Sequence, residues 1–158
     1  MRVEHVMTRD PARCRPHDTT AAAARVMWDR DCGSVPVVDE AGMPVGMITD
    51  RDICMAAYTR GARLEEMTVD TVMSADVRTC RPRDAIAAAE RLMARAQVRR
   101  LPVVDEHGRL VGIVALGDVA RARGESRLRL TVERVFADVA KTLAAISQPR
   151  VTREGARA

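Results

Sequence analysis

The stretch GSVPVVDEAGMPVGMITDRD, residues 33–52, decides the fold because a second copy, RRLPVVDEHGRLVGIVALGD, occupies residues 99–118. The repeat extends beyond this phrase. Residues 6–53 align with residues 72–119 at a constant offset of 66 positions without a gap, and 21 of the 48 pairs are identical. Self-similarity at a fixed period is typical of chains built from repeated structural units, and here it predicts two copies of a unit of about 50 residues.

Composition limits the kind of protein that this chain can be. Its 158 residues are 47% hydrophobic and 30% charged, which predicts a chain that folds and stays in solution. A net charge of +4, with both signs spread along the chain, suits an anionic ligand but does not indicate nucleic acid. The aromatic residues are Trp28, Tyr58 and Phe136, too few to form the stacking surfaces that bind single strands.

Signals for export or membrane insertion are the next feature. We find no apolar run of about 18 residues that could span a membrane. The start, MRVEHVMTRD at residues 1–10, has no apolar signal-peptide core. We therefore expect a cytoplasmic protein without membrane contact, in which the four cysteines stay reduced.

Each copy reads as strand, helix, strand, strand, helix. Asp18 has the type and position of a helix N-cap, and Asp84 repeats it in the second copy. The first helix is predicted to run to about residue 31. Apolar spacing assigns these residues to the inner faces of the two helices: Ala22, Val26 and Met27 in the first copy, and Ile86, Ala89, Leu92 and Met93 in the second.

The middle of each copy predicts a β-hairpin. SVPVVD and PVGMIT are β-rich runs separated by EAG, and Gly42 and its counterpart Gly108 are placed to supply a positive φ in the turn. A short helix is predicted after each hairpin, at residues 50–57 and 117–123. One such unit would expose an apolar sheet face, whereas two units packed face to face would bury it. We therefore expect a pseudo-two-fold axis within the chain and two related clefts between the halves.

The remaining segments divide the chain further. We assign residues 1–57 and 72–123 to the two repeats, residues 58–71 to a polar connector, and residues 150–158 to a disordered tail. Residues 124–149 form a helical extension with apolar residues at helical spacing: Val132, Val135, Phe136, Val139, Leu143 and Ile146. We expect this apolar face to pack against a second chain in a homodimer rather than to fold back onto its own repeats.

The doubled phrase, preceded in each copy by VMT or VMS and by a helix ending in RVM or RLM, resembles the cystathionine β-synthase (CBS) domain. Two in tandem resemble a CBS pair, or Bateman module, over about residues 3–123, and most of all the stand-alone bacterial proteins of this kind. The resemblance implies an α/β (α+β) fold of two pseudo-symmetric β-α-β-β-α repeats packed sheet to sheet, with a C-terminal amphipathic helix added. It also implies a homodimer and a regulatory ligand: AMP, ADP, ATP or S-adenosylmethionine.

The resemblance assigns a ligand cleft to the T-x-x-D element at the end of each hairpin. In the first copy this element begins with Thr49 and ends with Asp52. A carboxylate can accept from both ribose hydroxyls, and the amides of a helix N-terminus suit a phosphate. The opposite wall is expected from Arg99 and Arg100, as a bidentate phosphate clamp. Met47 could contact the adenine together with Val35 and Ile113. The alternatives are a plain helix cap at Thr49 and a solvated strand edge at the arginines.

The second cleft departs from the family pattern. Asp118 keeps the acid, but Ala115 replaces the threonine. Ser34 stands where the other cleft has an arginine, and Arg51 is the cation placed to help there. Ile113 is expected in its wall. We therefore predict that the Asp52 cleft binds nucleotide more tightly than the Asp118 cleft.

Other kinds of site are less well supported. Cys14 and His17 have the spacing of half a zinc site, but Cys14 and Cys80 are repeat equivalents that buried cysteines explain better. We therefore predict no metal site and no catalytic cofactor. No nucleophilic grouping falls in the repeated phrase, so we expect a binding module that regulates an unidentified protein, and not an enzyme. Two alternatives stay open: a structural dimerisation module with vestigial clefts, and a protein that contacts nucleic acid through its arginines.

Overall fold

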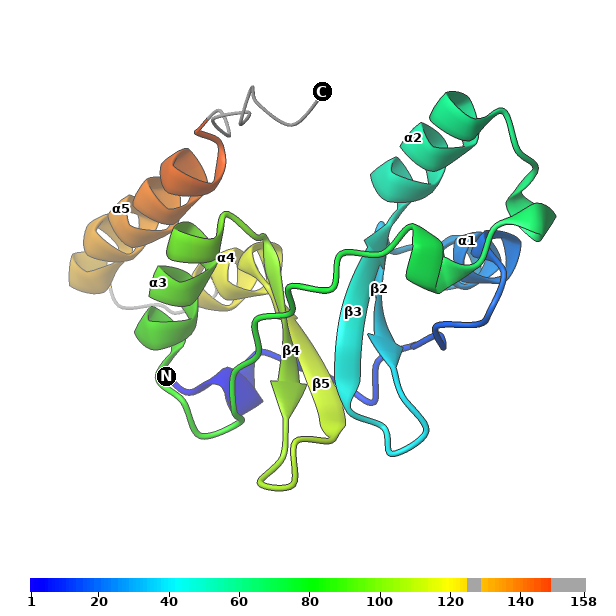
Figure 1. The fold of residues 1–158 in the computed structure, drawn as a ribbon. Helices are drawn as coiled ribbons and strands as arrows, with labels where there is room; N and C mark the ends of the chain where they lie inside the picture. The colour runs from blue at the N-terminus through cyan, green and yellow to red at the C-terminus, as the bar shows by residue number, and fades with distance from the viewer. Residues whose placement is uncertain (125–128, 149–158) are drawn as a thin grey trace, which may run out of the picture.

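The computed structural model describes residues 1–124 and 129–148 of the chain. Two β-hairpins lie side by side at the centre, and helices cover their outer sides (Figure 1). The strands are β1 (Thr8–Arg9), β2 (Ser34–Val38), β3 (Pro44–Thr49), β4 (Arg100–Val104) and β5 (Leu110–Ala115). The helices are α1 (Thr20–Asp29), α2 (Asp50–Arg60), α3 (Ile86–Ala96), α4 (Leu116–Gly124) and α5 (Arg129–Ile146), with 3₁₀ turns at Val3–His5, Leu64–Glu66 and Val69–Thr71. The predicted α/β fold of two hairpin-centred repeats is confirmed.

The first strand of each repeat pairs with the hairpin of the other repeat. β1 runs antiparallel to β5, with Thr8 opposite Ile113, so that the sheet order is β1-β5-β4. In the other direction, Ser74 forms a β-bridge with Met47 of β3. Ser74 is the repeat counterpart of Thr8. This exchange was not predicted, because the sequence pattern places a strand in each copy without saying which sheet it joins.

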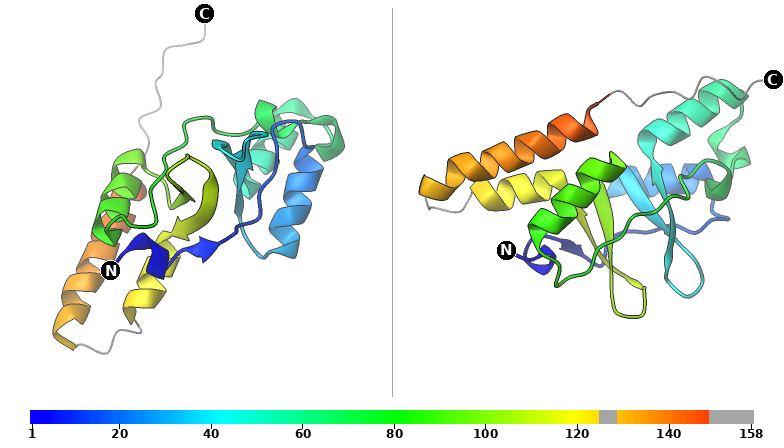
Figure 2. Two further views of the ribbon diagram at one scale, coloured as in Figure 1. Left: turned by 90° about the horizontal axis from the view of Figure 1, so that it is seen from below. Right: turned by 60° about the vertical axis from the view of Figure 1, so that its left-hand side comes forward.

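The residues before these strands are exchanged as well. Val3 is fully buried in the core built on β4 and β5, and its counterpart Val69 is fully buried in the core built on β2 and β3. The carbonyl of Met1 accepts from the amide of Ile86 at 3.1 Å. The carbonyl of Met67 accepts from the amide of Thr20 at 2.8 Å. Each half therefore contains a piece of the other, and both crossings are visible in Figure 2.

Two glycines allow the crossing segments to lie close to the hairpins. A side chain at Gly112 would meet the Met7 sulfur at 2.8 Å and the Thr8 carbonyl oxygen at 3.0 Å. A side chain at the equivalent Gly46 would collide with the sulfur of Met73. Packing rather than backbone conformation therefore explains the glycine in the repeated phrase, since φ is not positive at either residue.

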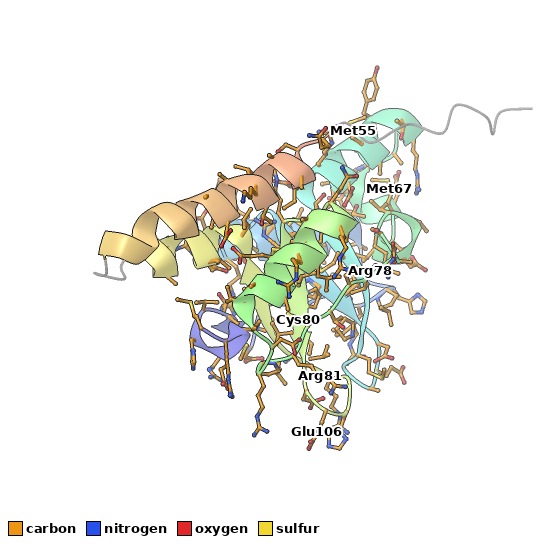
Figure 3. The ribbon with its side chains drawn as sticks, turned by 90° about the vertical axis from the view of Figure 1, so that its left-hand side faces the viewer. Met55, Met67, Arg78, Cys80, Arg81 and Glu106 are labelled. Carbon is orange, nitrogen blue, oxygen red and sulfur yellow. The ribbon has the colours of Figure 1, made fainter. Side chains whose placement is uncertain are left out.

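The hairpin turns follow the prediction. Gly42 and Gly108 have φ angles of 81° and 80°, as expected. In the second turn the carboxylate of Asp105 accepts from the amides of His107 and Arg109 at 2.9 and 2.8 Å. The pKa of Asp105 is lowered from its usual value, mainly by the hydrogen bond that its carboxylate accepts from the Arg109 amide. Figure 3 shows Glu106 at the tip of this turn, away from the helices.

The predicted helix caps were wrong by one residue. Thr19, not Asp18, caps α1, because its hydroxyl accepts from the Ala22 amide at 3.1 Å. Asp18 instead accepts from the amide of Arg15 at 2.7 Å, within the preceding turn. In the second repeat, Ala85 is the N-cap residue and makes no side-chain cap bond, while Asp84 accepts from the amide of Arg81 at 2.7 Å. The exchanged segment sets the helix start, because its carbonyls take the amides of Thr20 and Ile86.

Other helix details also differ from the prediction. α1 ends at Asp29 rather than near residue 31, where Asp31 has a left-handed φ of 47°. Ala22 is exposed, and Ala23 is buried in its place. The helix after the first hairpin continues to Arg60 and stops at Gly61, whose φ is 61°. In the second repeat, the predicted inner residues Ile86, Ala89 and Met93 are buried.

Helix α5 packs on α3 and α4 of its own chain (Figures 1 and 2). Ile146 is buried in the core of the second repeat, and Val139 packs against that core. The side-chain amide of Gln97 donates to the carbonyls of Ala145 and Gln148. The expectation that this face packs against a second chain rather than its own repeats is therefore wrong for Val139 and Ile146, whereas Leu143 is 46% exposed. The side chains of Val132, Val135 and Phe136 and the predicted disordered tail lie outside the described residues.

Among the helices of residues 1–124 and 129–148, none combines the length and the apolar character that a membrane crossing requires.

Candidate functional site

Thr49 and Asp52 form a reciprocal capping box where β3 passes into α2. The amide of Asp52 donates to the Thr49 hydroxyl oxygen at 3.1 Å. The Thr49 amide and hydroxyl both donate to Asp52 Oδ2, at 3.0 and 2.7 Å. Such a box satisfies backbone groups that the first helical turn leaves free. The capping role considered for Thr49 is confirmed, and both hydrogen bonds to the carboxylate use Oδ2, so that Asp52 Oδ1 lies outside the box.

Asp118 occupies the same place where β5 passes into α4. Because Ala115 has no hydroxyl, its amide alone donates to Asp118 Oδ2, at 2.9 Å. The other carboxylate oxygen accepts from the guanidinium of Arg121, one turn along α4. The side chain of Asp118 is 17% exposed and that of Arg121 is 75% exposed. The carboxylate is therefore held in place, while the exposed arginine can leave it at little cost.

A hydrogen bond between the two repeats lies beside this junction. The guanidinium of Arg100, at the start of β4, donates to the hydroxyl of Ser34 at 2.8 Å. Ser34 is buried at the start of β2, and Arg100 is half-buried. Of the two arginines that the sequence suggested as a phosphate clamp, Arg100 is therefore already hydrogen-bonded to a residue of the same chain.

A cavity of about 840 Å³ opens next to this bond, between the two repeats and α5. Small-molecule sites typically have volumes of about 300–1,000 Å³, so this cavity is large enough for a nucleotide. Six of the predicted ligand residues line it: Ser34, Arg99, Arg100, Ile113, Ala115 and Asp118. Four of the five residues predicted for the second cleft therefore share one cavity with both arginines predicted for the first.

Four predicted ligand residues lie elsewhere: Met47, Thr49, Arg51 and Asp52 are not in the lining of this cavity. Met47 joins its backbone to Ser74 through two hydrogen bonds. Arg51 is exposed on α2, so the structure does not bring it to Asp118 as expected. Val35, considered as an adenine contact, is fully buried in the core of the first repeat and is not available to a ligand.

The sequence interpretation missed other residues of the cavity wall. Arg9, Arg30 and Arg121 line it, as does the segment 8–12 that contains β1. The Asp118–Arg121 pair could have been found from its i,i+3 spacing on a predicted helix. Arg9 could not, because it reaches the cavity through the pairing of β1 with β5.

Cys14 and Cys80 lie outside the lining of this cavity, whereas Cys32 is part of it. Cys14 and Cys80 occupy equivalent positions in the two repeats, and both are buried. The pKa of each thiol is raised to about 12, mainly because burial removes it from solvent. His17 is 90% exposed and faces Asp70 at 3.9 Å. Within residues 1–124 and 129–148, no three His, Cys, Asp or Glu side chains gather into a metal-binding group.

Comparison with known proteins finds a family profile and relatives that match this chain. The profile of the CBS domain matches residues 3–58 and again residues 69–125. Over 118 residues the chain is 42% identical to CBS domain-containing protein YhcV of Bacillus subtilis. The aligned region covers 75% of this chain and 82% of that protein.

Two solved structures share the fold. The CBS domain pair of protein MJ0100, in complex with 5′-methylthioadenosine and S-adenosyl-L-methionine, aligns with a TM-score of 0.72 and 26% identity, over 80% of this chain and 98% of that one. CBSX2 in complex with AMP aligns with a TM-score of 0.70 and 26% identity, again over 80% and 98% of the two chains.

Proposed function

The chain belongs to the CBS domain family, and we propose that it is a regulatory module that binds an adenine nucleotide in the cavity between its repeats. The observation that carries this proposal is the shared cavity, where Asp118, Arg99 and Arg100 line the same space as Ser34 of the other repeat. The complexes of MJ0100 and CBSX2 with adenosine-type ligands support the ligand class. The module regulates through binding and catalyses no reaction of its own.

Each part of a nucleotide has a matching group in the cavity wall. The Asp118 carboxylate can accept from two ribose hydroxyls once Arg121 leaves it, and such charge-assisted bonds are the stronger kind. Arg99 and Arg100 offer planar guanidinium groups that match a phosphate. Ile113 gives the wall an apolar surface for the base.

The position of the cavity suggests how binding is transmitted. Its wall includes Gly33 and Ser34 of the first repeat, Asp118 of the second, and Val139 and Leu143 of α5. A ligand that touches all three parts stabilises the arrangement in which they meet. At a concentration of 100 times its dissociation constant, such a ligand adds about 2.7 kcal/mol to the free energy of unfolding.

A thermal-shift series with AMP, ADP, ATP and S-adenosylmethionine tests the proposal. At least one of them should raise the melting temperature, and calorimetry should then give its dissociation constant. Asp118→Asn removes the charge from the cavity, and Asp52→Asn is the matched control at the equivalent junction. We expect about a tenfold loss of affinity or more from Asp118→Asn, the factor that one charge-assisted hydrogen bond provides.

The two variants also decide which cleft is used. The sequence pattern alone predicts the larger loss at Asp52, and the cavity favours Asp118. A larger loss from Asp52→Asn would move the ligand to the other cleft. If none of the four compounds binds, the nucleotide-binding function is rejected.

A second candidate function, homodimerisation, is favoured by one surface. α1 and α2 flank a groove of about 650 Å³ that is lined by apolar side chains, including Ile53 and Leu64. Trp28 and Tyr58 on these helices are 87% and 82% exposed, and Met55 lies on α2 in Figure 3. The equivalent α3–α4 face is covered by α5. We propose that a second copy of the chain covers α1 and α2.

Sedimentation at micromolar concentration tests the dimer. The unchanged chain should sediment as a dimer, and Trp28→Glu with Tyr58→Glu should give a monomer. Met43→Glu is the control, because Met43 is an exposed apolar residue outside this groove. A monomer without any substitution would reject this candidate and leave the nucleotide proposal unaffected.

A further inference from the structure

The cavity between the repeats carries an excess of positive charge. Among the described residues, its lining contains five arginines and three aspartates: Arg9, Arg30, Arg99, Arg100 and Arg121 against Asp10, Asp31 and Asp118. The arginines come from different elements. The fold therefore gathers charges that lie far apart in the sequence around one space.

Two of the three carboxylates are already engaged. Asp118 is paired with Arg121, and Asp10 accepts from Arg13 at 3.3 Å. Arg13 is not part of the lining, so it neutralises Asp10 from outside the cavity. These pairs leave Asp31 as the carboxylate that offsets the remaining arginines.

The remaining arginines are available to an anion. Arg100 donates to the neutral hydroxyl of Ser34, which a phosphate oxygen can replace as a stronger acceptor. Arg9, Arg30 and Arg99 make no side-chain hydrogen bond or ion pair with any residue that the structure describes. All three are exposed, so a ligand that binds them does not first have to break a contact.

We propose that this cavity selects adenine nucleotides with two or three phosphates over AMP, and phosphorylated nucleotides over adenosine thioethers and sulfonium compounds. The inference rests on the proposed nucleotide-binding function and names its ligand class. Arg9, Arg30 and Arg99 act as the residues that set this preference.

Charge explains both parts of the selectivity. The contact that Asp118 offers to a ribose is the same for every adenosine compound, so it does not distinguish among them. Each added phosphate brings negative charge and oxygen acceptors to guanidinium groups that have no other partner, and such charge-assisted bonds are strong. S-adenosylmethionine carries a sulfonium cation where a nucleotide carries its first phosphate, and its single carboxylate, next to an ammonium group, offers the arginines much less negative charge than a di- or triphosphate. Methylthioadenosine is neutral at this position and gains nothing from them.

Calorimetry of the full chain with adenosine, methylthioadenosine, S-adenosylmethionine, AMP, ADP and ATP tests the order. We expect ATP and ADP to bind about tenfold or more tightly than AMP, the factor given by one further charge-assisted hydrogen bond. S-Adenosylmethionine should bind least tightly. The advantage of ATP should shrink as salt is raised, because the arginines are exposed and their field is screened.

Variants separate the arginines from the rest of the site. Arg9→Gln with Arg30→Gln should bring the affinity for ATP down to that for AMP and leave adenosine unchanged. Arg25→Gln is the matched control, since Arg25 is an exposed arginine of α1 that does not line the cavity. Inorganic tripolyphosphate should compete with ATP but not with adenosine.

The outcomes keep this inference apart from the function on which it rests. If AMP binds as tightly as ATP, or S-adenosylmethionine binds more tightly than either, the selectivity is rejected and the nucleotide function stands. If tripolyphosphate binds but no adenosine compound does, the arginines bind phosphate and the nucleotide function is rejected. If none of these compounds binds, both proposals are rejected.

Discussion

The hydroxyl of Ser34 accepts a hydrogen bond from the guanidinium of Arg100 at 2.8 Å, although the two residues occupy the same position, 66 residues apart, in their repeats. Two arginines at this pair of positions would repel each other, and two serines lack the reach of a guanidinium. The difference between the copies therefore creates one of the contacts that join them.

A double-mutant cycle should show that this contact couples the two halves. Ser34→Ala and Arg100→Gln each remove one partner of a half-buried hydrogen bond, and the coupling free energy should be about 0.5–1.5 kcal/mol. Urea unfolding of the four chains measures it. The same cycle with Arg99→Gln is the control, because Arg99 makes no bond to Ser34 and should show no coupling. A coupling near zero for both cycles would mean that the hydrogen bond adds nothing to stability.

Gly112→Ala should destabilise the fold more than Gly46→Ala. A methyl group at Gly112 meets the backbone oxygen of Thr8, which cannot move without disturbing β1, and overpacking of this kind costs about 1–3 kcal/mol. At Gly46 the obstacle is the flexible side chain of Met73, which can turn away. The free energy of unfolding in urea gives the comparison.

Gly117→Ala is the control for the glycine substitutions. Gly117 lies in the first turn of α4 with open space around it, so alanine should be neutral or add up to about 1 kcal/mol through helix propensity. Equal stability of the Gly112 and Gly117 variants would contradict the close crossing of β1 over β5.

Val3→Ala should loosen the second repeat, although Val3 belongs to the first in sequence. Val3 is fully buried in the β4–β5 half, and loss of its contacts should cost about 1.5–3 kcal/mol. Amide hydrogen exchange, compared with that of the unchanged chain, should accelerate more in β4 and β5 than in β2 and β3. Val69→Ala is the mirror variant and should give the opposite pattern. Faster exchange in β2 after Val3→Ala would argue against the exchange of segments.

Stability should fall in strongly basic solution because of two buried thiols. Burial raises the pKa of Cys14 and Cys80 from 9.0 to about 12, and Asp18 and Asp84 add to the effect. Below pH 9.0 both states keep these protons, and the contribution to stability is complete. Above it the unfolded chain loses them while the native chain keeps them up to about pH 12, so the free energy of unfolding falls by about 1.4 kcal/mol per pH unit for each thiol.

Urea unfolding from about pH 8 to about pH 11, a range that includes the ordinary thiol pKa of 9.0, measures this slope. Cys14→Ala with Cys80→Ala should flatten it, whatever their effect on stability at neutral pH. Cys54→Ala is the control, since Cys54 is exposed and should leave the slope as it is. An unchanged slope in the double variant would show that these thiols are not protected in the native state.

Local patterns predicted the parts of the fold that local physics determines. The turn glycines Gly42 and Gly108 have the positive φ expected, and the inner face of α3 is buried as its spacing indicates. The errors at Asp18 and Asp84 have a tertiary cause, since segments from the opposite repeat fix the starts of α1 and α3.

The candidate site also combines residues that a local motif predicts with residues that only the tertiary structure brings there. The T-x-x-D positions and the paired arginines could be read as motifs, and Arg99, Arg100 and Asp118 do line a cavity. Arg9 and Arg30 carry no motif, and they reach the cavity only through the way the strands and helices are assembled. Whether Asp52 or Asp118 holds the stronger cleft stays a prediction until binding is measured.

The exchange of segments also governs when the chain can complete its structure during synthesis. Residues 1–9 leave the ribosome well before the groups that they pack against, because their pairing partner β5 and the core that buries Val3 are translated about a hundred residues later, roughly 5–20 s at ordinary rates of elongation. The first hairpin can form in the meantime, but its own core waits for Val69. Residues 1–9 are therefore buried only after both hairpins have been translated, and until then their apolar side chains are open to any chaperone or neighbouring chain.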